Sequence, residues 1–348
     1  MKGWDADIAW RSRRGAAVAA LAALILLSPR PVEAQLTSEC KRAADGLPGV
    51  IPAADRERVE QYCNLVALTV EATQPRLGLG LSGGNPVPGT GSTLGMRLGT
   101  LPRLSLALRA TAVKTDIPDI RTETATGELT FPLGSIDADG ALGLYSGFSV
   151  APTVGGIGSV DLLASAGIIP VPSGEGFGDA SPTTWAAGAR VGLLRESFTL
   201  PGLSVSAMYR SLGEVTYGDS LLQQDDAYFH ADLRQLSLRG VVSKDVLFFA
   251  FAAGAGWDRF TSDVAFGASS AGTFPGTNYI VRIPSTELQT DATVVFGNLA
   301  LNFLVANLVA ELGWQSGGDL ESATLAPGRT VTGDDGTIFG SLALRLSF

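Results

Sequence analysis

Apolar and polar residues alternate along most of the chain after residue 75. Between residues 104 and 112, leucine and alanine at even positions alternate with small or polar residues at odd positions, and the same period recurs around 203–210 and 235–242. A period of two places one face of a β-strand against an apolar environment and the other against a small or polar one. The pattern therefore predicts an all-β region over residues 76–348.

Turn residues divide this region into segments of strand length. They predict twelve strands, at 76–83, 91–100, 103–115, 121–131, 140–151, 183–195, 202–217, 231–243, 246–259, 286–297, 301–315 and 336–348. The apolar stretch 157–172 can add strands, which makes fourteen the alternative number. A soluble sandwich of two sheets produces the same alternation, so the pattern alone does not choose between a sandwich and a barrel.

The lengths of the connections favour a barrel. Short turns are predicted at 101–103, 199–202, 243–245 and 297–298, and longer polar loops lie near 217–231, 259–285 and 316–336. Transmembrane β-barrels have an even number of strands, with short turns at one end and longer loops at the other. The expected fold class is thus a transmembrane antiparallel up-and-down β-barrel of about twelve strands. The uncharged stretch 292–310 is interpreted as two of these strands joined by a tight turn, because Gly297 and Asn298 interrupt it.

Composition narrows the class of protein further. Only 17% of the residues are charged and the mean hydropathy is +0.24, whereas soluble domains typically carry about 25% charged residues. The net charge of −9 argues against a nucleic-acid partner, because binding to phosphates needs a basic surface. A β-rich chain with so little charge is a strong candidate for insertion into a membrane.

The first 34 residues have the organisation of a secretory signal peptide. Basic residues from Lys2 to Arg14 precede an apolar run over 15–27, and small residues at Val32 and Ala34 predict cleavage before Gln35. The two cysteines, Cys40 and Cys63, lie soon after this site. In an exported chain they are predicted to form one disulfide.

One helix is expected ahead of the barrel. Pro52 suits the start of a helix, and Val59, Val66 and Val70 lie on one face of the segment 52–72. This helix cannot bury its apolar face alone. Residues 35–75 are therefore predicted to form a helical plug or a periplasmic segment, followed by the barrel at 76–348.

The C-terminal strand carries a resemblance to a known class. Leu342, Leu344, Leu346 and Phe348 share one face of this strand, and Phe348 is the last residue. The ending resembles the C-terminal strand of bacterial outer-membrane β-barrels, in which it is the insertion signal read by the barrel-assembly machinery. The resemblance implies the outer membrane of a Gram-negative cell, with outer-membrane lipid and the assembly machinery as partners.

Aromatic residues agree with this orientation. If the C-terminus is periplasmic, the strand order places Trp185, Trp257 and Trp314 near the outer ends of strands. The same count places phenylalanines near the inner ends, at Phe248, Phe296, Phe303 and Phe348. Aromatic girdles at both interfaces are typical of membrane barrels.

Charged residues of the strands are predicted to face the lumen, since charges on the lipid face are costly. On the predicted register they are Arg97, Arg109, Glu128, Arg190, Arg210, Arg239, Asp291, Glu311 and Arg345. Two interpretations remain open. The arginines line a pore that favours anions, or they pair with carboxylates and carbonyls of an inserted plug. A plug helix would bring its own acids, Asp55, Glu57 and Glu60, within reach of these arginines.

No motif predicts an active site, a cofactor or a metal centre. His230 is the only histidine and is interpreted as a solvated residue of a loop or strand end. Acidic residues of the predicted outer loops, at 219, 225–226 and 334–335, give only an unspecific calcium candidate. We therefore expect a protein without enzymatic activity.

The predicted function is the passage of small molecules, as a channel or transporter. The alternative is a structural or surface-interaction barrel in which the plug is permanent. A second alternative comes from Gly83-Gly84-Asn85-Pro86, which follows the helix and resembles the hatch of long-chain fatty-acid outer-membrane transporters. Those barrels have fourteen strands, and alanine stands where this chain has Val87. The solute, the state of the plug and the oligomeric state stay open.

Overall fold

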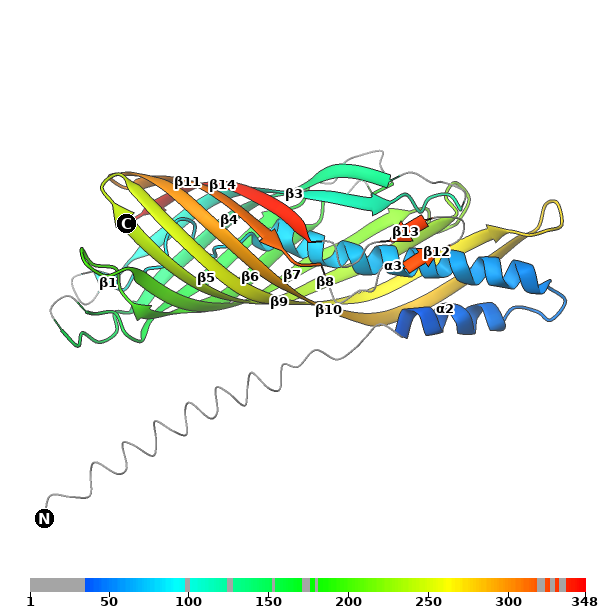
Figure 1. Ribbon diagram of the computed structural model, residues 1–348, viewed down its shortest axis with the longest axis horizontal. Helices are drawn as coiled ribbons and strands as arrows, with labels where there is room; N and C mark the ends of the chain where they lie inside the picture. Colours follow the sequence, from blue (N-terminus) through cyan, green and yellow to red (C-terminus); the bar gives the residue numbers. More distant parts are fainter. Residues whose placement is uncertain are drawn as a thin grey trace, which may run out of the picture. The chain divides into compact units, whose positions relative to one another are not determined.

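A closed antiparallel β-barrel forms the body of the protein (Figure 1). The computed structural model describes residues 35–97, 101–123, 128–151, 154–170, 176–178, 181–317, 323–325, 329–331 and 336–348. The signal peptide predicted over residues 1–34 lies outside the described residues. The barrel confirms the predicted fold class, but it has ten strands where twelve were expected.

Consecutive strands of the barrel pair with each other, and the last strand pairs with the first. The strands are β3 (Leu104–Pro118), β4 (Glu128–Tyr145), β5 (Ser159–Ile168), β6 (Thr183–Leu194), β7 (Gly202–Gly218), β8 (Ala227–Val246), β9 (Phe249–Ala271), β10 (Asn278–Phe303), β11 (Ala306–Gln315) and β14 (Thr337–Ser347). Closure comes from pairing between β14 and β3. Two small hairpins lie outside the barrel sheet, formed by β1 (Met96–Arg97) with β2 (Leu101–Pro102) and β12 (Ala323–Leu325) with β13 (Arg329–Val331).

The alternation of the sequence appears directly in the burial of the strands. In β3, Leu108 is 60% exposed on the outer face, whereas the next residue, Arg109, is 1% exposed and faces the lumen. A one-residue change of register would reverse every side chain. The apolar exterior therefore fixes which charges lie inside.

Three misassigned segments account for the difference in strand number. Residues 76–83 end a helix, and 91–100 contribute only β1 to a small hairpin. The predicted strands 121–131 and 140–151 are one strand, β4. The uncertain stretch 157–172 contains β5, so the total is ten.

Two turns lie further along the chain than expected. Gly297 and Asn298 continue inside β10, opposite Ala253 and Ala252 of β9. The stretch 292–310 does form two strands joined by a tight turn, but the turn residues are Leu304 and Val305. In the same way, 243–245 belong to β8 and the turn follows at Leu247 and Phe248.

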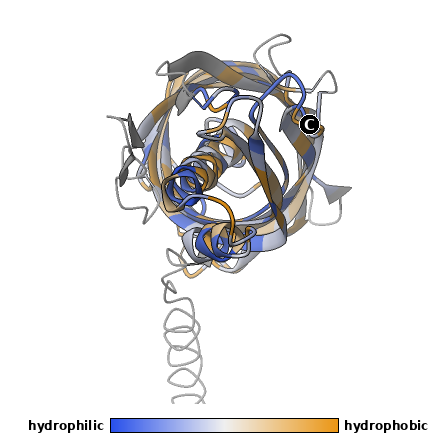
Figure 2. Ribbon diagram, turned by 90° about the vertical axis from the view of Figure 1, so that its right-hand side faces the viewer, coloured by the Kyte–Doolittle hydropathy of each residue, from blue (hydrophilic) through white to orange (hydrophobic). Residues whose placement is uncertain are grey.

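Two helices precede the barrel, α2 (Gln35–Asp45) and α3 (Ala53–Ser82). The end view shows a helix inside the ring of strands (Figure 2). α3 begins after Pro52, as predicted, but continues ten residues past Ala72 and includes Pro75. Most of its residues beyond the second turn are buried. The Cys40–Cys63 disulfide joins the two helices, which confirms the predicted pair. Among the described residues, no helix combines the length and hydropathy needed to span a membrane.

The barrel has two different ends. Its turn end carries the connections 146–158, 195–201, 247–248 and 304–305, together with the C-terminus. Its loop end carries 119–127, 169–182, 219–226, 272–277 and 316–336. The long strands β9 and β10, of 23 and 26 residues, run on beyond the other strands at the loop end (Figure 1).

Five predicted aromatic positions follow this division. Trp185 and Trp314 lie exposed on the outer face near the loop end, and Phe248, Phe303 and Phe348 are exposed at the turn end. Phe296 does not belong to a girdle. It is buried in the lumen with Leu79 and Val294, because its register in β10 points it inward.

Candidate functional site: an occupied lumen

A plug occupies the lumen, formed by α3 and the segment that follows it, residues 83–95. Four buried arginines of the wall reach this segment and donate to its backbone carbonyls. The contacts join Arg239 Nε to Gly84 O at 3.1 Å, Arg109 Nη1 to Asn85 O at 3.1 Å, Arg345 Nη1 to Pro88 O at 2.6 Å and Arg190 Nη1 to Thr90 O at 3.5 Å. The arginines come from β8, β3, β14 and β6, so the plug is held from several sides of the barrel.

Glu311 of β11 binds the same segment through its amides. Its carboxylate accepts hydrogen bonds from the backbone N–H groups of Gly84 at 2.9 Å and Asn85 at 2.8 Å. Asn298 donates to Glu311 at 2.6 Å and accepts from the Asn85 side chain at 2.8 Å. Both the donors and the acceptors of the plug backbone thus find partners in the wall, as a buried loop requires.

Carboxylates of the wall neutralise the arginines. The pairs are Arg109–Asp139 at 3.0 Å, Arg190–Asp161 at 2.7 Å, Arg239–Asp258 at 2.8 Å and Arg210–Asp137 at 4.0 Å. Sequence reasoning missed all four aspartates. Asp137 and Asp139 alternate with outward residues along β4, and that period of two was the signal that could have found them.

The predicted excess of lumen arginines is therefore corrected. The four missed aspartates and Glu311 oppose the buried arginines 109, 190, 210, 239 and 345. Arg109, Arg190 and Arg239 each bind both a wall carboxylate and a plug carbonyl, whereas Arg210 has only the carboxylate and Arg345 only the carbonyl. The plug thus supplies the carbonyls and the wall supplies the carboxylates.

Most predicted lumen residues do face inward. Arg109, Arg190, Arg210, Arg239, Glu311 and Arg345 are all buried inside the barrel. Asp291 is an exception, because its neighbours Thr290 and Ala292 point inward and it pairs on the outer face with Arg259 at 2.9 Å. The side chains of Arg97 and Glu128 lie outside the described residues.

Close packing of glycines brings the plug against the wall. A Cβ atom at Gly84 would lie 2.3 Å from the Phe296 ring, and one at Gly78 would lie 2.0 Å from the ring of Phe260. Val87 then packs in an apolar cluster with small and medium side chains of four strands, Ala141, Leu163, Ala186 and Met208.

The acidic residues at the start of the plug helix do not reach the lumen arginines. Asp55 accepts hydrogen bonds from Thr273 at the loop end, at 3.0 Å from its amide nitrogen, and Glu57 is exposed. α3 enters the barrel from the loop end, so its first turns lie far along the barrel from the segment that the arginines bind.

Candidate chemistry elsewhere is sparse. His230 is partly exposed on β8, with Nδ1 3.6 Å from a Glu214 carboxylate oxygen. The Asp219 carboxylate accepts hydrogen bonds from backbone N–H groups of its own loop, those of Leu221, Gln223 and Gln224. Within the described ranges, no three His, Cys, Asp or Glu side chains are arranged to hold a metal ion. Asp334 and Asp335 lie outside those ranges.

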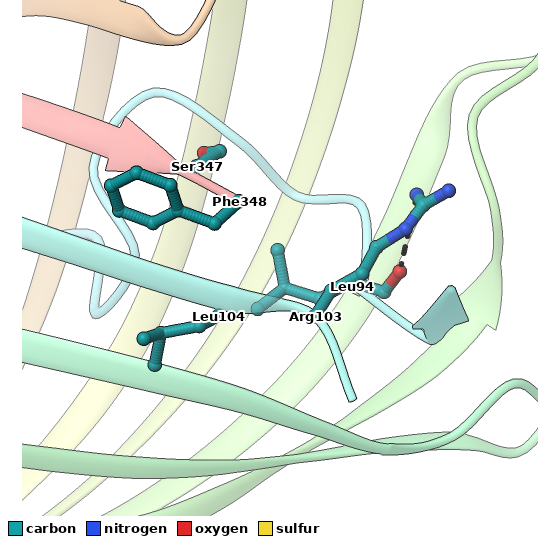
Figure 3. Close-up of a pocket in the computed structure, with 5 residues that line it drawn as sticks. All are labelled: Leu94, Arg103, Leu104, Ser347 and Phe348. Carbon is teal, nitrogen blue, oxygen red and sulfur yellow. Dashed lines mark hydrogen bonds between the residues drawn. The ribbon is translucent and has the colours of Figure 1, made fainter. Parts of the chain in front are cut away.

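The C-terminal strand closes the barrel at the turn end. Leu342, Leu344 and Phe348 are exposed on its outer face, and Leu346 is half-buried. The backbone of Phe348 donates to Leu104 O at 2.8 Å and accepts from Leu104 N at 3.3 Å. Beside this pair is an open cavity of about 360 Å³, lined by Leu94, Arg103, Leu104, Ser347 and Phe348 (Figure 3).

No protein-family model and no curated protein sequence matches the chain. Among solved structures, the translocator domain of the autotransporter NalP from Neisseria meningitidis is 10% identical, with 82% of this chain and 98% of that chain covered and a TM-score of 0.38. The transport unit of the autotransporter AIDA-I from Escherichia coli is 10% identical, with coverage of 80% and 98% and a TM-score of 0.34. A mutant of the monoaromatic hydrocarbon channel TodX is 10% identical, with coverage of 71% and 89% and a TM-score of 0.28.

The wall of the barrel has the properties that a membrane demands of a β-structure. All ten strands are paired on both sides, so no strand edge is left unpaired in the ring. Along the strands the outward side chains are mostly apolar, and the buried arginines and carboxylates of the wall lie inside. The chain therefore has the fold of the bacterial outer-membrane β-barrels.

Proposed function

We propose that this protein is an outer-membrane barrel whose lumen is kept closed by its own N-terminal plug, and that its role is structural or surface-facing. The observation that carries this proposal is the set of four wall arginines bound to plug carbonyls, together with Glu311 bound to plug amides. Withdrawal of the plug from the lumen would leave these arginines and Glu311 without their plug partners.

Energetics support a closed resting state. A buried hydrogen bond that involves a charged group typically contributes about 1.5–3 kcal/mol. Arg109 and Arg239 each bind an aspartate and a plug carbonyl at once. Withdrawal of residues 83–95 would break several hydrogen bonds between wall arginines and plug carbonyls together. The hatch-like Gly83-Gly84-Asn85-Pro86 segment is part of this plug, but ten strands do not fit the fourteen of the fatty-acid transporters it resembles.

Conductance in a planar bilayer tests the closure. The full chain is expected to give no channel steps. A double variant, Arg239→Ala with Arg345→Ala, removes two contacts to Gly84 and Pro88 and should produce steps.

Arg282→Ala is the matched control, because Arg282 lies exposed on β10 and does not touch the plug. Retention of the heat-modifiable gel shift shows that each variant is folded. A steady, ion-selective conductance of the full chain would contradict a closed lumen.

Passage of small ions beside the plug is the second candidate, and a separate observation favours it. Among the described residues, Arg210 Nε and Nη1 and Asp137 Oδ1 are buried without a hydrogen-bond partner. Hydroxyl oxygens of Thr111, Ser165 and Thr184 share this state on the neighbouring strands. Buried polar groups nearly always have partners, so water is expected along this side of the plug. If the full chain does conduct, Arg210→Ala should lower its preference for anions.

Targeting follows from two further features. We propose that the segment 1–34 is cleaved during export and that Leu342, Leu344, Leu346 and Phe348 form the signal for assembly into the outer membrane. The outward placement of Leu342, Leu344 and Phe348 supports a role in contact with lipid and with the assembly machinery.

A further inference from the structure

The plug enters the barrel at the loop end and leaves it at the turn end. We propose that α2 and the first turns of α3, residues 35–62, stand on the outer side of the outer membrane, so that the chain runs inward through its own barrel. This inference rests on the proposed outer-membrane location, but not on whether the lumen is closed.

The two ends of the barrel define outside and inside. Two-residue turns at 247–248 and 304–305 and the C-terminus lie at the turn end. The longest connection, 316–336, and the extended hairpin of β9 and β10 lie at the loop end. In bacterial outer-membrane barrels the short turns are periplasmic and the long loops face outward.

Contacts of α3 place its beginning at the loop end. Arg58 Nη1 donates to Ala271 O at 2.7 Å, at the tip of β9. The Tyr62 hydroxyl donates to Ile120 O at 2.6 Å, in the connection after β3. Asp55 accepts from Thr273, in the connection between β9 and β10. One contact with the tip of β9 and two with different loop-end connections thus fix the entry point of the helix.

Contacts of the following segment place its end at the opposite rim. Leu94 N donates to Asp161 at 3.0 Å, near the start of β5, and Met96 N donates to the Ser146 hydroxyl at 2.8 Å, just after β4. The chain then enters β3 at Leu104, beside the C-terminal residue. Residues 53–97 therefore traverse the whole barrel from the loop end to the turn end.

α2 stays outside the barrel at the loop end. The disulfide joins Cys40 to Cys63, near the point where α3 enters the lumen, and Leu36 is buried against the rest of the protein. The connection between the helices is accessible, because Gly46 and residues 48–50 are exposed and Val50 is 89% exposed. This helical hairpin is therefore surrounded by the water outside the cell and not by the periplasm.

Epitope accessibility on intact cells tests the placement. One variant of the full chain carries a short epitope between Gly49 and Val50, and the matched variant carries it after Phe198, which is 99% exposed at the turn end. Antibody labelling is compared before and after permeabilisation of the outer membrane. The epitope at Gly49 should be labelled fully on intact cells, and the epitope at Phe198 only after permeabilisation.

The reverse pattern, or labelling at Gly49 only after permeabilisation, overturns the proposal. If the insertion at Gly49 prevents folding, as judged by loss of heat-modifiability, the epitope is moved to a position directly before Gln35 and the same outcomes apply. Conductance of the two tagged proteins is recorded as well. A channel with a surface-exposed hairpin would refute only the closed lumen, whereas a silent barrel with a periplasmic hairpin would refute only this inference.

Discussion

Gly84 shows at the scale of single residues how tightly the plug fits. Its amide binds Glu311, and its Cα faces the ring of Phe296 without room for a side chain. We expect Gly84→Ala to destabilise the plug by about 1–3 kcal/mol, the usual cost of overpacking a buried site. The midpoint of thermal unfolding in detergent, followed by gel mobility, should fall.

Two further variants separate overpacking from other effects. Gly297→Ala should have little influence, because a Cβ there meets only Ala252 O, at 3.9 Å. Gly84→Ala should cost less stability in a Phe296→Ala background than in the wild-type chain, since the truncated side chain vacates the space that the new methyl group needs. An unchanged midpoint for Gly84→Ala alone would show that the plug is loosely held.

Asp55 links the entry of the plug helix to pH. Hydrogen bonds from Thr273 hold the pKa of the Asp55 carboxyl below its ordinary value. A carboxyl with a lowered pKa contributes stability above the pKa of the unfolded chain, about 3.9, and this contribution is lost as the pH falls through the folded value. The start of α3 should therefore loosen only in acid, below about pH 4.

Hydrogen exchange of residues 53–62 as a function of pH measures this loosening. Asp55→Asn should remove the acid transition and leave the segment loosened at neutral pH. Asp45→Asn is the control, because Asp45 is exposed at the end of α2. Identical acid transitions in the wild-type chain and in Asp55→Asn would contradict the role given to Asp55.

At the scale of elements, the β8–β9 turn combines strain with apolar side chains. Leu247 has φ of 56°, a left-handed conformation that suits glycine or asparagine but costs a leucine about 1–2 kcal/mol. Leu247→Asn should therefore raise the unfolding midpoint in detergent. Leu304→Asn, in the other tight turn, should not, because Leu304 is not among the residues with positive φ. A fall in the midpoint for Leu247→Asn would mean that the leucine side chain outweighs the strain.

The elements that the sequence predicted well are those with one clear period. β3, β6, β7 and β14 follow the expected ranges within a few residues, because their alternation is strong and unbroken. α3 was predicted too short, since Pro75, Gly78 and Gly80 are poor helix formers. Packing inside the barrel overrides that propensity, because glycine allows the helix to approach Phe260.

Polar lumen residues explain the other errors. In β4 the inward positions carry Ser135, Asp137 and Asp139, which resemble a loop when the plug that pairs with them is not known. Gly297-Asn298 resembles a hairpin turn, but Asn298 faces inward and binds Glu311 and Asn85. The candidate site was thus half predictable: the arginines were visible as inward charges, and their partners depended on contacts between segments far apart in sequence.

At the scale of the whole molecule, the pairing that closes the barrel extends to Phe348. Both backbone groups of Phe348 pair with Leu104 at the start of the first barrel strand. Deletion of Phe348 should reduce the heat-modifiable protein in the outer-membrane fraction more strongly than Phe348→Ala, which keeps the backbone pair. Phe198→Ala is the control, because Phe198 is equally aromatic and exposed at the same end. Equal yields for deletion and substitution would assign the effect to the side chain alone.

The Cys40–Cys63 disulfide gives the molecule a mechanical property beyond its contribution to stability. α3 fills the lumen, and at its N-terminal end the disulfide holds α2 beside it. Two helices side by side are about twice as wide as a single helix, roughly 20 Å against 10 Å. A helix pair of this width cannot follow α3 through the lumen of a ten-stranded barrel. Even with every lumen contact broken, the chain could not be drawn toward the turn end while the disulfide is intact. Because the plug continues into β3, the arrangement is a lasso whose tail carries the disulfide-linked helices as a stopper. Reduction removes this steric block and leaves the lumen contacts to hold the plug.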